Sequence, residues 1–443
     1  MTEDALDRHR EVLAEKIVSR TAEVAVIGLG YVGLALAAEF AAAGFRVTGL
    51  ELNGERVEAL LGGASYTPDV PSALVRQLVA AGLLCPTQDP ARLASADVFI
   101  ICVPTPLRRA KEPDISHVLA AIGTIAKHLR PGRLVVLEST TYPGTTEEIL
   151  LPAVEAGGWK VGAEVFVAFS PERVDPGNKT YPTREIPKIV GGVTAACTEM
   201  ARVLYSQVVC RAIPVASPKV AEMAKVLENT YRSVNIALAN EFALICRRLG
   251  IDPWAVIEAA ASKPFGFTPF YPGPGIGGHC IPVDPLYLSW KARAANYEPR
   301  FIALADEINR AMPRHILDLV AEALNNVGKC LRGSRILVLG VAYKRGVNDV
   351  RESPALEIIE ELLRAGALVA YSDPHVPTLA LNGARWSSRA LDAATLAVQD
   401  CVVIATDHAE VDYQAVADHA PLVVDTRNAT RHVVDARATI VPL

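Results

Sequence analysis

Several features are missing from this sequence of 443 residues, and each absence narrows the range of functions open to it. No apolar run reaches the ~20 residues that span a bilayer. The uncharged run 24–38 is shorter and is interrupted by three glycines. The first twenty residues carry charges of both signs and lack the apolar centre of a secretory signal. We therefore expect a helical extension over residues 1–20, no membrane segment and a cytoplasmic location.

Recognisable metal-binding and basic motifs are also absent. The eight cysteines include no CxxC pair and no Cys/His cluster at metal-ligand spacing, so we expect no metal site and a reducing compartment. The 44 basic residues are outnumbered by 49 acidic ones, which gives a net charge of −5. Because nucleic acids and anionic membranes attract basic surfaces, neither is an expected partner.

What the sequence does contain is the composition of a packed globular protein, with 51% apolar and 21% charged residues. Strand-like runs alternate with helical stretches, starting with EVAVIGLG, an alanine-rich helix and RVTGL, and continuing through VFIICVP, RLVVLEST and EVFVAFSP. Such alternation predicts a parallel doubly wound sheet. A second βαβ pattern starts at SRILVLGV and continues to the strand-like runs CVVIATDH and PLVVDTRN.

One long helical pattern lies between these two halves. It runs from Ser217, placed to cap it, through Pro218 at the first helical position to Gly250, which ends it. Both of its faces carry apolar residues, so we expect it to be buried at a domain or subunit interface. The predicted fold class is α/β, with two Rossmann-like doubly wound domains joined by this long central helix. The predicted division is an extension (1–20), a first Rossmann domain (21–213), a central helical domain (214–326) and a second Rossmann-like domain (327–443).

The first half carries a dinucleotide-binding signal. In VIGLGYVGL, Gly28, Gly30 and Gly33 form GxGxxG between a strand and a helix, where they permit a tight turn and close approach of a pyrophosphate. The next strand ends at Glu51, whose carboxylate can bind both ribose hydroxyls and repels a 2′-phosphate, which favours NAD. The alternative is a glycine-rich turn that holds no ligand. Arg56 is either an adenosine contact or a solvated helix arginine.

A second candidate site lies in the stretch 264–285, which is half proline and glycine and therefore excludes a regular helix or a central strand. Cys280 follows Gly277 and Gly278, where the missing side chains expose the sulfur. The other seven cysteines lie in apolar or helical surroundings. Asp284 is four residues further on, within reach of the thiol or of a bound water. Cys280 is thus a candidate nucleophile, with a structural thiol as the alternative.

The long helix presents a polar stripe. Glu222, Lys225, Asn229 and Arg232 are spaced by three, four and three residues, which places them on one face. For Glu222 and Arg232 a solvated face is at least as good an interpretation. Lys225 and Asn229 are the better candidates, because a semi-buried lysine beside an amide can stabilise an oxyanion or exchange protons.

In the second Rossmann-like half, a basic loop follows the strand ILVLG. It contains Lys344, Asp349, Arg351 and Ser353 ahead of Pro354, which marks a helix start. A lysine and an arginine beside helix-start amides suit a diphosphate. The alternative is a basic surface loop.

These motifs together resemble the nucleotide-sugar 6-dehydrogenase family, from about Val24 to Asn428. The marks of the resemblance are VIGLGYVGL, VPTPL followed by EPDIS, EST at 138–140, SPERVDPGN, AEMAKVLENTYRSVNIALANE, YPGPGIGGHCIPVDP and GVAYKRGVNDVRESPA. SPERVDPGN and KPFGFTPFYPGPG are similar to the branch that acts on UDP-N-acetylhexosamines, UDP-N-acetylglucosamine in particular. The resemblance implies NAD as cofactor, a UDP-sugar as substrate and a homodimer or larger homo-oligomer formed through the long helix.

The resemblance also implies a double oxidation of the C6 alcohol to a carboxylate. Cys280 would hold the aldehyde as a thiohemiacetal, and a second oxidation would give a thioester that water releases. Lys225 and Asn229 would stabilise oxyanions. Asp284, Thr140 and Glu172 would handle water and protons.

In the UDP-glucose branch a further glutamate follows Glu172, but here Pro176 stands at that position. The role of that glutamate is therefore not assigned to any residue of this chain, and Asp175 is a candidate for it.

The residues that the motifs and the resemblance together assign form three sets. Catalysis is assigned to Cys280, Lys225, Asp284, Glu172, Asn229 and Thr140. NAD binding is assigned to Gly28, Gly30, Tyr31, Val32, Gly33, Glu51, Arg56, Pro104, Thr105 and Thr140. Substrate binding is assigned to Glu172, Arg173, Lys225, Asn229, Phe270, Tyr271, Gly273, Gly277, Lys344 and Arg351.

Three alternatives stay open at this point. The same reaction could act on UDP-N-acetylmannosamine or UDP-glucose. A one-step dehydrogenase of the related hydroxyacid type would need no Cys280. A protein of another class, a catalytically inactive nucleotide-binding protein, would keep the fold without the chemistry. The configuration of the sugar, the oligomer size, feedback regulation and the pathway are not determined by the sequence.

Overall fold

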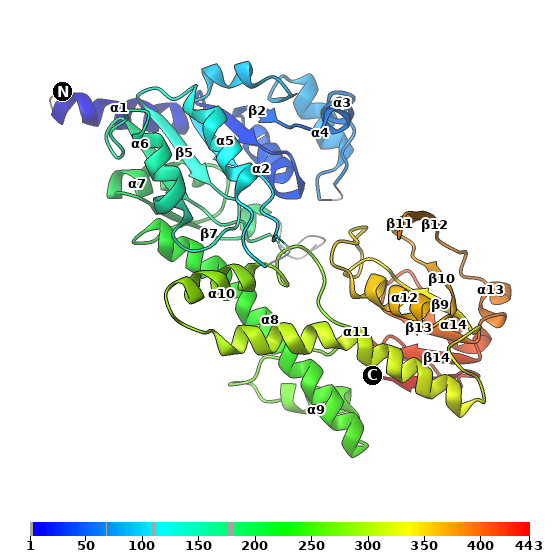
Figure 1. Cartoon of the computed structure of the whole chain (residues 1–443). Coiled ribbons are helices and arrows are strands. Elements are labelled where there is room, and N and C mark those ends of the chain that lie inside the picture. Colours follow the sequence, from blue (N-terminus) through cyan, green and yellow to red (C-terminus); the bar gives the residue numbers. More distant parts are fainter. Residues whose placement is uncertain (1–2, 68, 109–110, 175–180, 182) are drawn as a thin grey trace. The chain divides into compact units, whose positions relative to one another are not determined.

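The computed structural model describes residues 3–67, 69–108, 111–174, 181 and 183–443, with side chains from residue 8 onward. The chain divides into two compact units (Figure 1). The first unit comprises residues 1–228 and 286–296, and the second comprises residues 229–285 and 297–443. None of the described helices has both the length and the apolar content needed to cross a membrane.

The first unit is built on a sheet of eight strands in the order β3-β2-β1-β4-β5-β6-β7-β8. Neighbouring strands are parallel, as predicted, except that β6 and β7 run antiparallel. A parallel connection usually needs a helical crossover, and the described residues between these two strands contain no α-helix. The strands are β1 (Glu23–Ile27), β2 (Arg46–Leu50), β3 (Leu84–Thr87), β4 (Val98–Ile101), β5 (Arg133–Leu137), β6 (Val165–Phe169), β7 (Lys188–Gly192) and β8 (Ala212–Pro214).

Helices cover both faces of this sheet, because side chains alternate along a strand. Val24 and Val26 of β1 join one hydrophobic cluster, with residues of α1, α2, α4 and α7, and Ala25 and Ile27 join another, with residues of α5 and α6. The predicted N-terminal helical extension is confirmed as α1. The helices are α1 (Glu3–Val18), α2 (Tyr31–Ala42), α3 (Gly54–Leu61), α4 (Ser72–Ala80), α5 (Ser116–Ala126), α6 (Leu151–Glu155) and α7 (Ala195–Tyr205), with the short turns η1 (Pro90–Ser95), η2 (Thr146–Leu150) and η3 (Thr183–Glu185).

The long helix is confirmed as α8 (Pro218–Leu249), and the boundary between the units falls inside it, between Glu228 and Asn229. Ser217 caps it as predicted, since its hydroxyl accepts the backbone N–H of Val220 at 3.4 Å. Gly250 ends it with a φ of +67°, a conformation that glycine adopts without strain.

The second unit contains a parallel sheet of five strands in the order β10-β9-β13-β14-β15 and a separate hairpin, β11–β12. Ile336 and Val338 of β9 join one cluster and Leu337 and Leu339 another, so this sheet is also covered on both faces. The strands are β9 (Arg335–Leu339), β10 (Leu368–Ser372), β11 (Thr378–Leu381), β12 (Ala384–Ser387), β13 (Cys401–Ile404), β14 (Leu422–Asp425) and β15 (Thr439–Pro442). The remaining helices of the chain are α9 (Pro253–Ala261), α10 (Asp284–Ala294), α11 (Arg300–Asn326), α12 (Pro354–Arg364), α13 (Ala393–Ala397) and α14 (Tyr413–His419).

The proline- and glycine-rich stretch behaves as predicted. No helix or strand is formed between the end of α9 at Ala261 and the start of α10 at Asp284, a span that is described throughout. Because they include the candidate nucleophile Cys280, we call residues 262–283 the catalytic loop.

Candidate active site

The turn between β1 and α2 has the shape of a dinucleotide cradle. Gly28 has a φ of +90°, and a Cβ on Gly33 would lie 1.9 Å from the carbonyl oxygen of Gly28, so α2 can approach β1 only with glycine at that position. A Cβ on Gly30 would meet nothing within 4 Å. Gly30 therefore faces open space at the N-terminus of α2, where backbone amides favour an anion. Tyr31 and Val32 form the first turn of this helix.

Glu51 lies directly after β2, and its carboxylate is held by the backbone. Its Oε2 accepts the N–H of Leu29 and its Oε1 the N–H of Asn53, each at 3.0 Å. Arg56 contacts the same carboxylate at 3.5 Å and lies over the ring of Tyr66 at 5.3 Å. The structure thus brings Arg56 to Glu51 rather than leaving it as a purely solvated helix residue.

Two further residues predicted to bind the cofactor meet at the ends of neighbouring strands. Thr105 follows β4, Thr140 follows β5, and the hydroxyl of Thr105 donates to the carbonyl oxygen of Thr140 at 2.7 Å. Thr105 is buried, Thr140 is half-buried and Pro104 is exposed. The carboxyl ends of parallel strands are where ligands bind in such sheets, so this placement suits a cofactor site.

Glu172 lies after β6 and is held on both carboxylate oxygens. Its Oε1 accepts the N–H groups of Arg173 and Val174, and its Oε2 accepts from Lys188 Nζ at 3.0 Å. The side chain of Arg173 pairs with Glu228 at 2.7 Å and donates to the carbonyl of Pro187. Asp175 and Pro176, the positions with an unassigned duty, lie outside the described residues.

The polar stripe on α8 is divided differently from our expectation. Arg232 is exposed, but Glu222 is 1% exposed, so a solvated face is wrong for Glu222. Its carboxylate accepts the N–H groups of Gly144 and Thr146 and the hydroxyl of Thr146, because it caps the backbone at the start of η2. The helical spacing did not reveal that partner, which is distant in sequence.

Lys225, one turn further along α8, is 8% exposed. Within the described part of the chain its ammonium group makes no hydrogen bond or ion pair. A mostly buried lysine side chain whose ammonium group has no protein partner suits an anionic or carbonyl ligand.

In the second unit the structure brings Asn229, Asp284 and Cys280 together. Asn229 Nδ2 donates to Asp284 Oδ2 at 2.5 Å, and the backbone N–H of Asp284 donates to the carbonyl oxygen of Cys280 at 2.8 Å. Cys280 is exposed, whereas Asp284 is 1% exposed. Cys280 is thus exposed and is joined by a backbone hydrogen bond to Asp284, whose buried carboxylate an amide holds in place.

Exposure does not distinguish Cys280 from every other cysteine. Cys210 and Cys330 are also exposed, so the expected apolar or helical setting is wrong for these two. The feature that distinguishes Cys280 is the neighbouring pair of Asp284, the first residue of α10, and Asn229, which lies within α8.

The catalytic loop is pinned by close backbone packing. Gly278 has a φ of +86° and donates its N–H to the carbonyl oxygen of Arg351 at 3.0 Å. A Cβ on Gly277 would lie 2.6 Å from the Cβ of Tyr343, and the N–H of Gly273 donates to Asn240 Oδ1 at 2.9 Å. These contacts place the loop against the basic segment 343–351.

Aromatic contacts hold the earlier part of the loop. The ring of Phe270 meets that of Tyr231 on α8 at 5.7 Å, and Tyr271 stacks on Trp254 of α9 at 5.6 Å. Both candidate residues are therefore anchored to helices of the second unit.

The predicted diphosphate segment ends at a helix, as expected, since α12 begins at Pro354. Ser353 is 2% exposed, and its hydroxyl has no hydrogen-bond partner among the described residues. Arg351 pairs with Asp349 at 2.6 Å, and Lys344 is half-buried. An unsatisfied hydroxyl at a helix N-terminus, in the same segment as Lys344 and Arg351, suits an anion.

Arg427 is a candidate that the sequence analysis missed. It follows β14, donates from Nε to the carbonyl of Ala405 at 3.0 Å, and its Nη1 would lie 2.4 Å from a Cβ on Gly273. Burial lowers the pKa of this guanidinium. The sequence signal was available as an arginine directly after a strand in PLVVDTRN, at the ligand-binding edge of the sheet.

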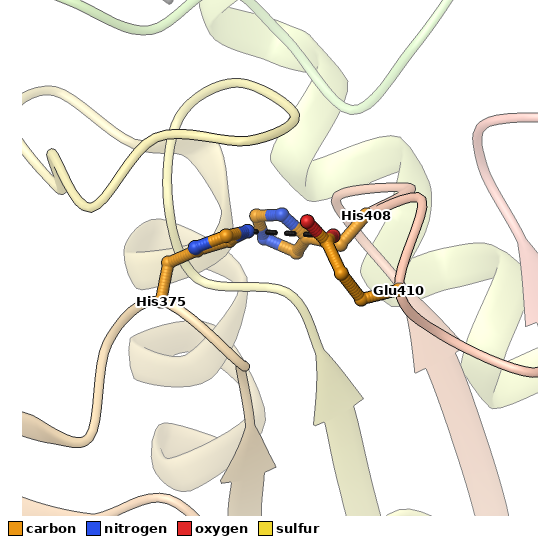
Figure 2. Close-up of side chains that lie close together, drawn as sticks. All are labelled: His375, His408 and Glu410. Atoms are coloured by element: carbon orange, nitrogen blue, oxygen red, sulfur yellow. Dashed lines mark ion pairs between the residues drawn. The ribbon is translucent and has the colours of Figure 1, made fainter. Parts of the chain in front are cut away.

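A histidine cluster at the ends of β10 and β13 is drawn in Figure 2. Ligand atoms of His375, His408 and Glu410 lie within 4.8 Å of one another. However, Nδ1 of His408 accepts the N–H of Gly346 at 3.2 Å, which leaves the ring proton on Nε2, where Asp373 accepts it at 3.1 Å. Because a coordinating nitrogen must be unprotonated, this tautomer opposes metal binding by His408. We therefore assign the hydrogen bonds of His408 a structural role.

Comparison with known proteins gives a consistent result along the chain. Three family profiles match consecutive segments: the UDP-glucose/GDP-mannose dehydrogenase family NAD binding domain (22–209), central domain (219–311) and UDP binding domain (337–432). A UDP-N-acetyl-D-glucosamine 6-dehydrogenase from Pseudomonas aeruginosa is 38% identical over 80% of this chain and 83% of its own length. A UDP-N-acetyl-D-mannosamine dehydrogenase from Methanococcus vannielii is 34% identical over 96% of both chains. Among solved structures, the UDP-D-ManNAc dehydrogenase from Pyrococcus horikoshii superposes with a TM-score of 0.86 at 34% identity, covering 95% of this chain and 98% of the other.

Proposed function

The chain belongs to the UDP-glucose/GDP-mannose dehydrogenase family, and we propose that it oxidises the C6 alcohol of a UDP-N-acetylhexosamine to the carboxylate. Its general class is that of an NAD-dependent UDP-sugar dehydrogenase. The finer proposal is carried by one observation, the exposed Cys280 beside the buried Asp284 and its partner Asn229.

The first unit fits NAD. The glycine cradle at Gly30 is open, and Glu51 is held where a carboxylate binds ribose hydroxyls and opposes a 2′-phosphate. Bound there, NAD would supply the hydride acceptor, which the four-electron oxidation requires twice per sugar. The cofactor residues Tyr31, Val32, Arg56, Pro104, Thr105 and Thr140 would surround it.

Cys280 explains how one site can perform two oxidations. Its sulfur would add to the C6 aldehyde carbon while the aldehyde oxygen gains a proton, giving a thiohemiacetal. Loss of a hydride and that proton gives a thioester. Water then adds to the carbonyl carbon, the C–S bond breaks and the sulfur regains a proton. The carboxylate of Asp284 is positioned by Asn229 to accept protons in these steps.

Lys225 would provide charge for the oxygen at C6. The residue is 8% exposed and its ammonium group has no partner among the described residues, which supports a role toward substrate. Asn229 is four residues further along the same helix, and residues four apart share a face. Glu172 and Thr140 are proposed to handle water and protons.

The second unit is proposed to hold the UDP moiety. Lys344, Arg351 and the start of α12 would bind the diphosphate, and Arg427 adds a guanidinium at the edge of the sheet. Phe270, Tyr271, Gly273 and Gly277 of the catalytic loop would surround the sugar and nucleotide. In this scheme residues 21–213 bind NAD, residues 214–326 carry the catalytic groups and residues 327–443 bind UDP.

UDP-N-acetylglucosamine is our first choice of substrate, because a dehydrogenase for that sugar has the higher identity, 38%. UDP-N-acetylmannosamine is the second candidate. The Methanococcus vannielii dehydrogenase named for that sugar matches 96% of this chain. The solved structure of the Pyrococcus horikoshii dehydrogenase named for it superposes with a TM-score of 0.86.

We also propose a homodimer or larger homo-oligomer acting in the cytoplasm. Apolar side chains of α8 are exposed at intervals of three and four residues, and such a stripe suits a helix partner. The stripe in the second unit consists of Leu238, Phe242, Ile245 and Leu249.

The experiment is a substrate panel with NAD. Purified protein is incubated with UDP-N-acetylglucosamine, UDP-N-acetylmannosamine or UDP-glucose, and NADH and uronic acid are quantified together. We expect two NADH per acid formed and the highest kcat/KM with UDP-N-acetylglucosamine. One NADH per sugar would indicate a one-step dehydrogenase, and nucleotide binding without NADH would indicate an inactive binding protein.

A further inference from the structure

A lysine is buried between two carboxylates in the first unit, at the ends of β5 and β6. Lys188 Nζ lies 3.0 Å from Glu138 Oε2 and 3.0 Å from Glu172 Oε2. The hydroxyl of Tyr205 donates to the other oxygen of Glu138. Lys188 is 5% exposed and Glu138 1% exposed, so these charges are held away from bulk water.

The one reversed strand explains how the lysine arrives there. β5 and β6 are parallel, and Glu138 and Glu172 follow their carboxyl ends. β7 runs antiparallel to β6, with Ala168 opposite Gly192, so its first residue, Lys188, lies beyond the end of β6. Three residues far apart in sequence therefore meet at the edge of the sheet where Thr140 also lies.

The surroundings of the two carboxyl groups shift their pKa values in opposite directions. Burial raises the pKa of Glu138 to about 7, in spite of Lys188. Burial alone would also raise the pKa of Glu172, but Lys188 and the N–H groups of Val174 and Arg173 outweigh it and lower that pKa. Lys188 itself remains charged, because the two carboxylates raise its pKa in spite of burial.

The other titratable groups around Glu172 offer no second counter-charge. Burial raises the pKa of Cys102 after β4, and it likewise raises that of Glu39 on α2. Arg173 is committed to Glu228 of α8. In the described part of the chain, Lys188 is thus the only cation in an ion pair with Glu172.

Glu172 also has access to water. Together with Arg173 and Lys188 it lines a narrow pocket with room for about one water molecule, whose other walls include Glu39 and Pro187. A carboxylate that faces such a pocket can orient a water molecule.

We propose that Lys188, held by Glu138, is a positioning residue that fixes the orientation and the negative charge of Glu172 for its work on water in the dehydrogenase reaction. This inference rests on the proposed role of Glu172. Glu138 and Lys188 would affect the reaction only through Glu172, since neither is required to touch substrate, cofactor or a reacting atom.

The test compares Lys188→Met, Lys188→Arg and the double variant Glu138→Gln/Lys188→Met. Lys188→Met alone would leave the buried Glu138 carboxylate without a counter-charge and could prevent folding. The double variant removes both charges, so the comparison is still possible if the single variant does not fold. Lys127→Met, at an exposed lysine of the same unit, is the matched control. Folding is verified by circular dichroism.

The first measurement is the pH dependence of kcat and kcat/KM with UDP-N-acetylglucosamine and NAD. Loss of a neighbouring opposite charge raises a carboxyl pKa by about 1–3 units. We therefore expect the acidic limb to move upward by about 1–3 pH units in both Lys188→Met variants, with no shift in Lys188→Arg or Lys127→Met. A folded double variant with the wild-type profile would overturn the inference.

The second measurement needs no turnover. An infrared pH titration of the carboxylates, with Glu172→Gln as the reference that removes the Glu172 signal, reports the ionisation of Glu172 directly. If the wild-type protein oxidises no UDP-sugar, the proposed function fails, and this titration still decides whether Lys188 holds Glu172 ionised. An unchanged Glu172 signal in the double variant rejects the inference independently.

Discussion

At the level of single residues, hydrogen bonds from neighbouring groups hold the candidate site's carboxylates in place. Asp284 is buried and bound by Asn229, whereas the sulfur of Cys280 is exposed to the solvent. Glu51 and Asp373 each follow the second strand of a doubly wound unit, and each accepts the N–H of the residue after the first glycine. Asp373 accepts three further backbone N–H groups and the ring of His408. The equivalent carboxylate in the second unit is thus occupied by hydrogen bonds within the fold, whereas we propose that Glu51 binds the cofactor.

Replacing Cys280 by alanine should stop acid formation. We expect a fall of more than about 1000-fold in uronic acid production, as is common when a covalent nucleophile is removed. Affinity for UDP, measured by calorimetry, should be retained, because the thiol takes part in chemistry and not in nucleotide recognition. The control is Cys330→Ala, another exposed cysteine. Acid formation that survives in Cys280→Ala would contradict the thioester scheme.

Replacing Asp373 by asparagine should cost stability in a pH-dependent way. Burial alone would raise the pKa of Asp373, but the hydrogen bond from His408 and the backbone N–H groups lower it from 3.8 to about 2. Such a shift corresponds to about 2 kcal/mol of folding free energy at neutral pH. Because the folded-state pKa is depressed, this contribution is complete above about pH 4 and is lost as the pH falls towards 2.

Urea unfolding at several pH values measures this effect. The difference in free energy of unfolding between the wild type and Asp373→Asn should be at least about 2 kcal/mol at pH 7 and should shrink below pH 4. Asp318→Asn, at an exposed residue of α11, should change stability by less than about 0.5 kcal/mol. A deficit that is constant from pH 7 to pH 3 would reject this assignment.

At the scale of elements, the arrangement follows from how strands, turns and helices meet. Helix α2 can approach strand β1 closely because Gly33 has no side chain. Because β7 runs antiparallel to β6, its first residue, Lys188, lies at the carboxyl ends of β5 and β6. There it meets the carboxylates of Glu138 and Glu172. The catalytic loop has no regular structure, yet the backbone of Gly278 and the ring of Phe270 fix it to neighbouring segments.

Two glycines of the same motif should respond differently to alanine. Gly33→Ala places a Cβ 1.9 Å from a backbone oxygen, so it should lower the free energy of unfolding by at least about 1–3 kcal/mol. Gly30→Ala meets nothing within 4 Å, so it should leave stability unchanged and weaken NAD binding about 10-fold or more by occupying the pyrophosphate space. Thermal unfolding and NAD titration together measure both effects. Equal destabilisation by the two variants would be inconsistent with this division of roles.

At the scale of the whole molecule, each unit contains a doubly wound sheet that is covered on both faces. Helix α8 nevertheless exposes several large apolar side chains to solvent. Leu227 is 62% exposed and Leu249 67% exposed, although both lie in a helix that also contributes buried residues. Such a surface is unfavourable in a monomer. The long helix is therefore the element from which we expect assembly to proceed.

A charge in this stripe should reduce the oligomer size. We expect Phe242→Asp to shift the protein towards the monomer at micromolar concentration, because it would bury an uncompensated carboxylate at the contact. Sedimentation velocity measures the distribution. Ala384→Asp adds the same charge on the exposed β11–β12 hairpin and should have no effect. An unchanged distribution for Phe242→Asp would locate the contact elsewhere or exclude it.

The sequence by itself determined the α/β class, the bounds of α8, the glycine turn and the irregular catalytic loop. These features depend on residues close together in the chain, where periodicity, caps and missing side chains act directly. The family profiles confirm the predicted nucleotide-sugar dehydrogenase and NAD assignments. The individual roles of Cys280, Lys225, Asp284 and the other site residues remain predictions.

Only the tertiary structure decided the partners of buried charged groups. Glu222 caps η2 rather than facing solvent, Lys188 lies between Glu138 and Glu172, and Arg427 packs on Gly273. Each of these contacts joins segments that are far apart in sequence, and no local pattern specifies which distant carboxylate or carbonyl a side chain will meet. A buried charge must find a partner, but the order and direction of the strands determine which partner is within reach.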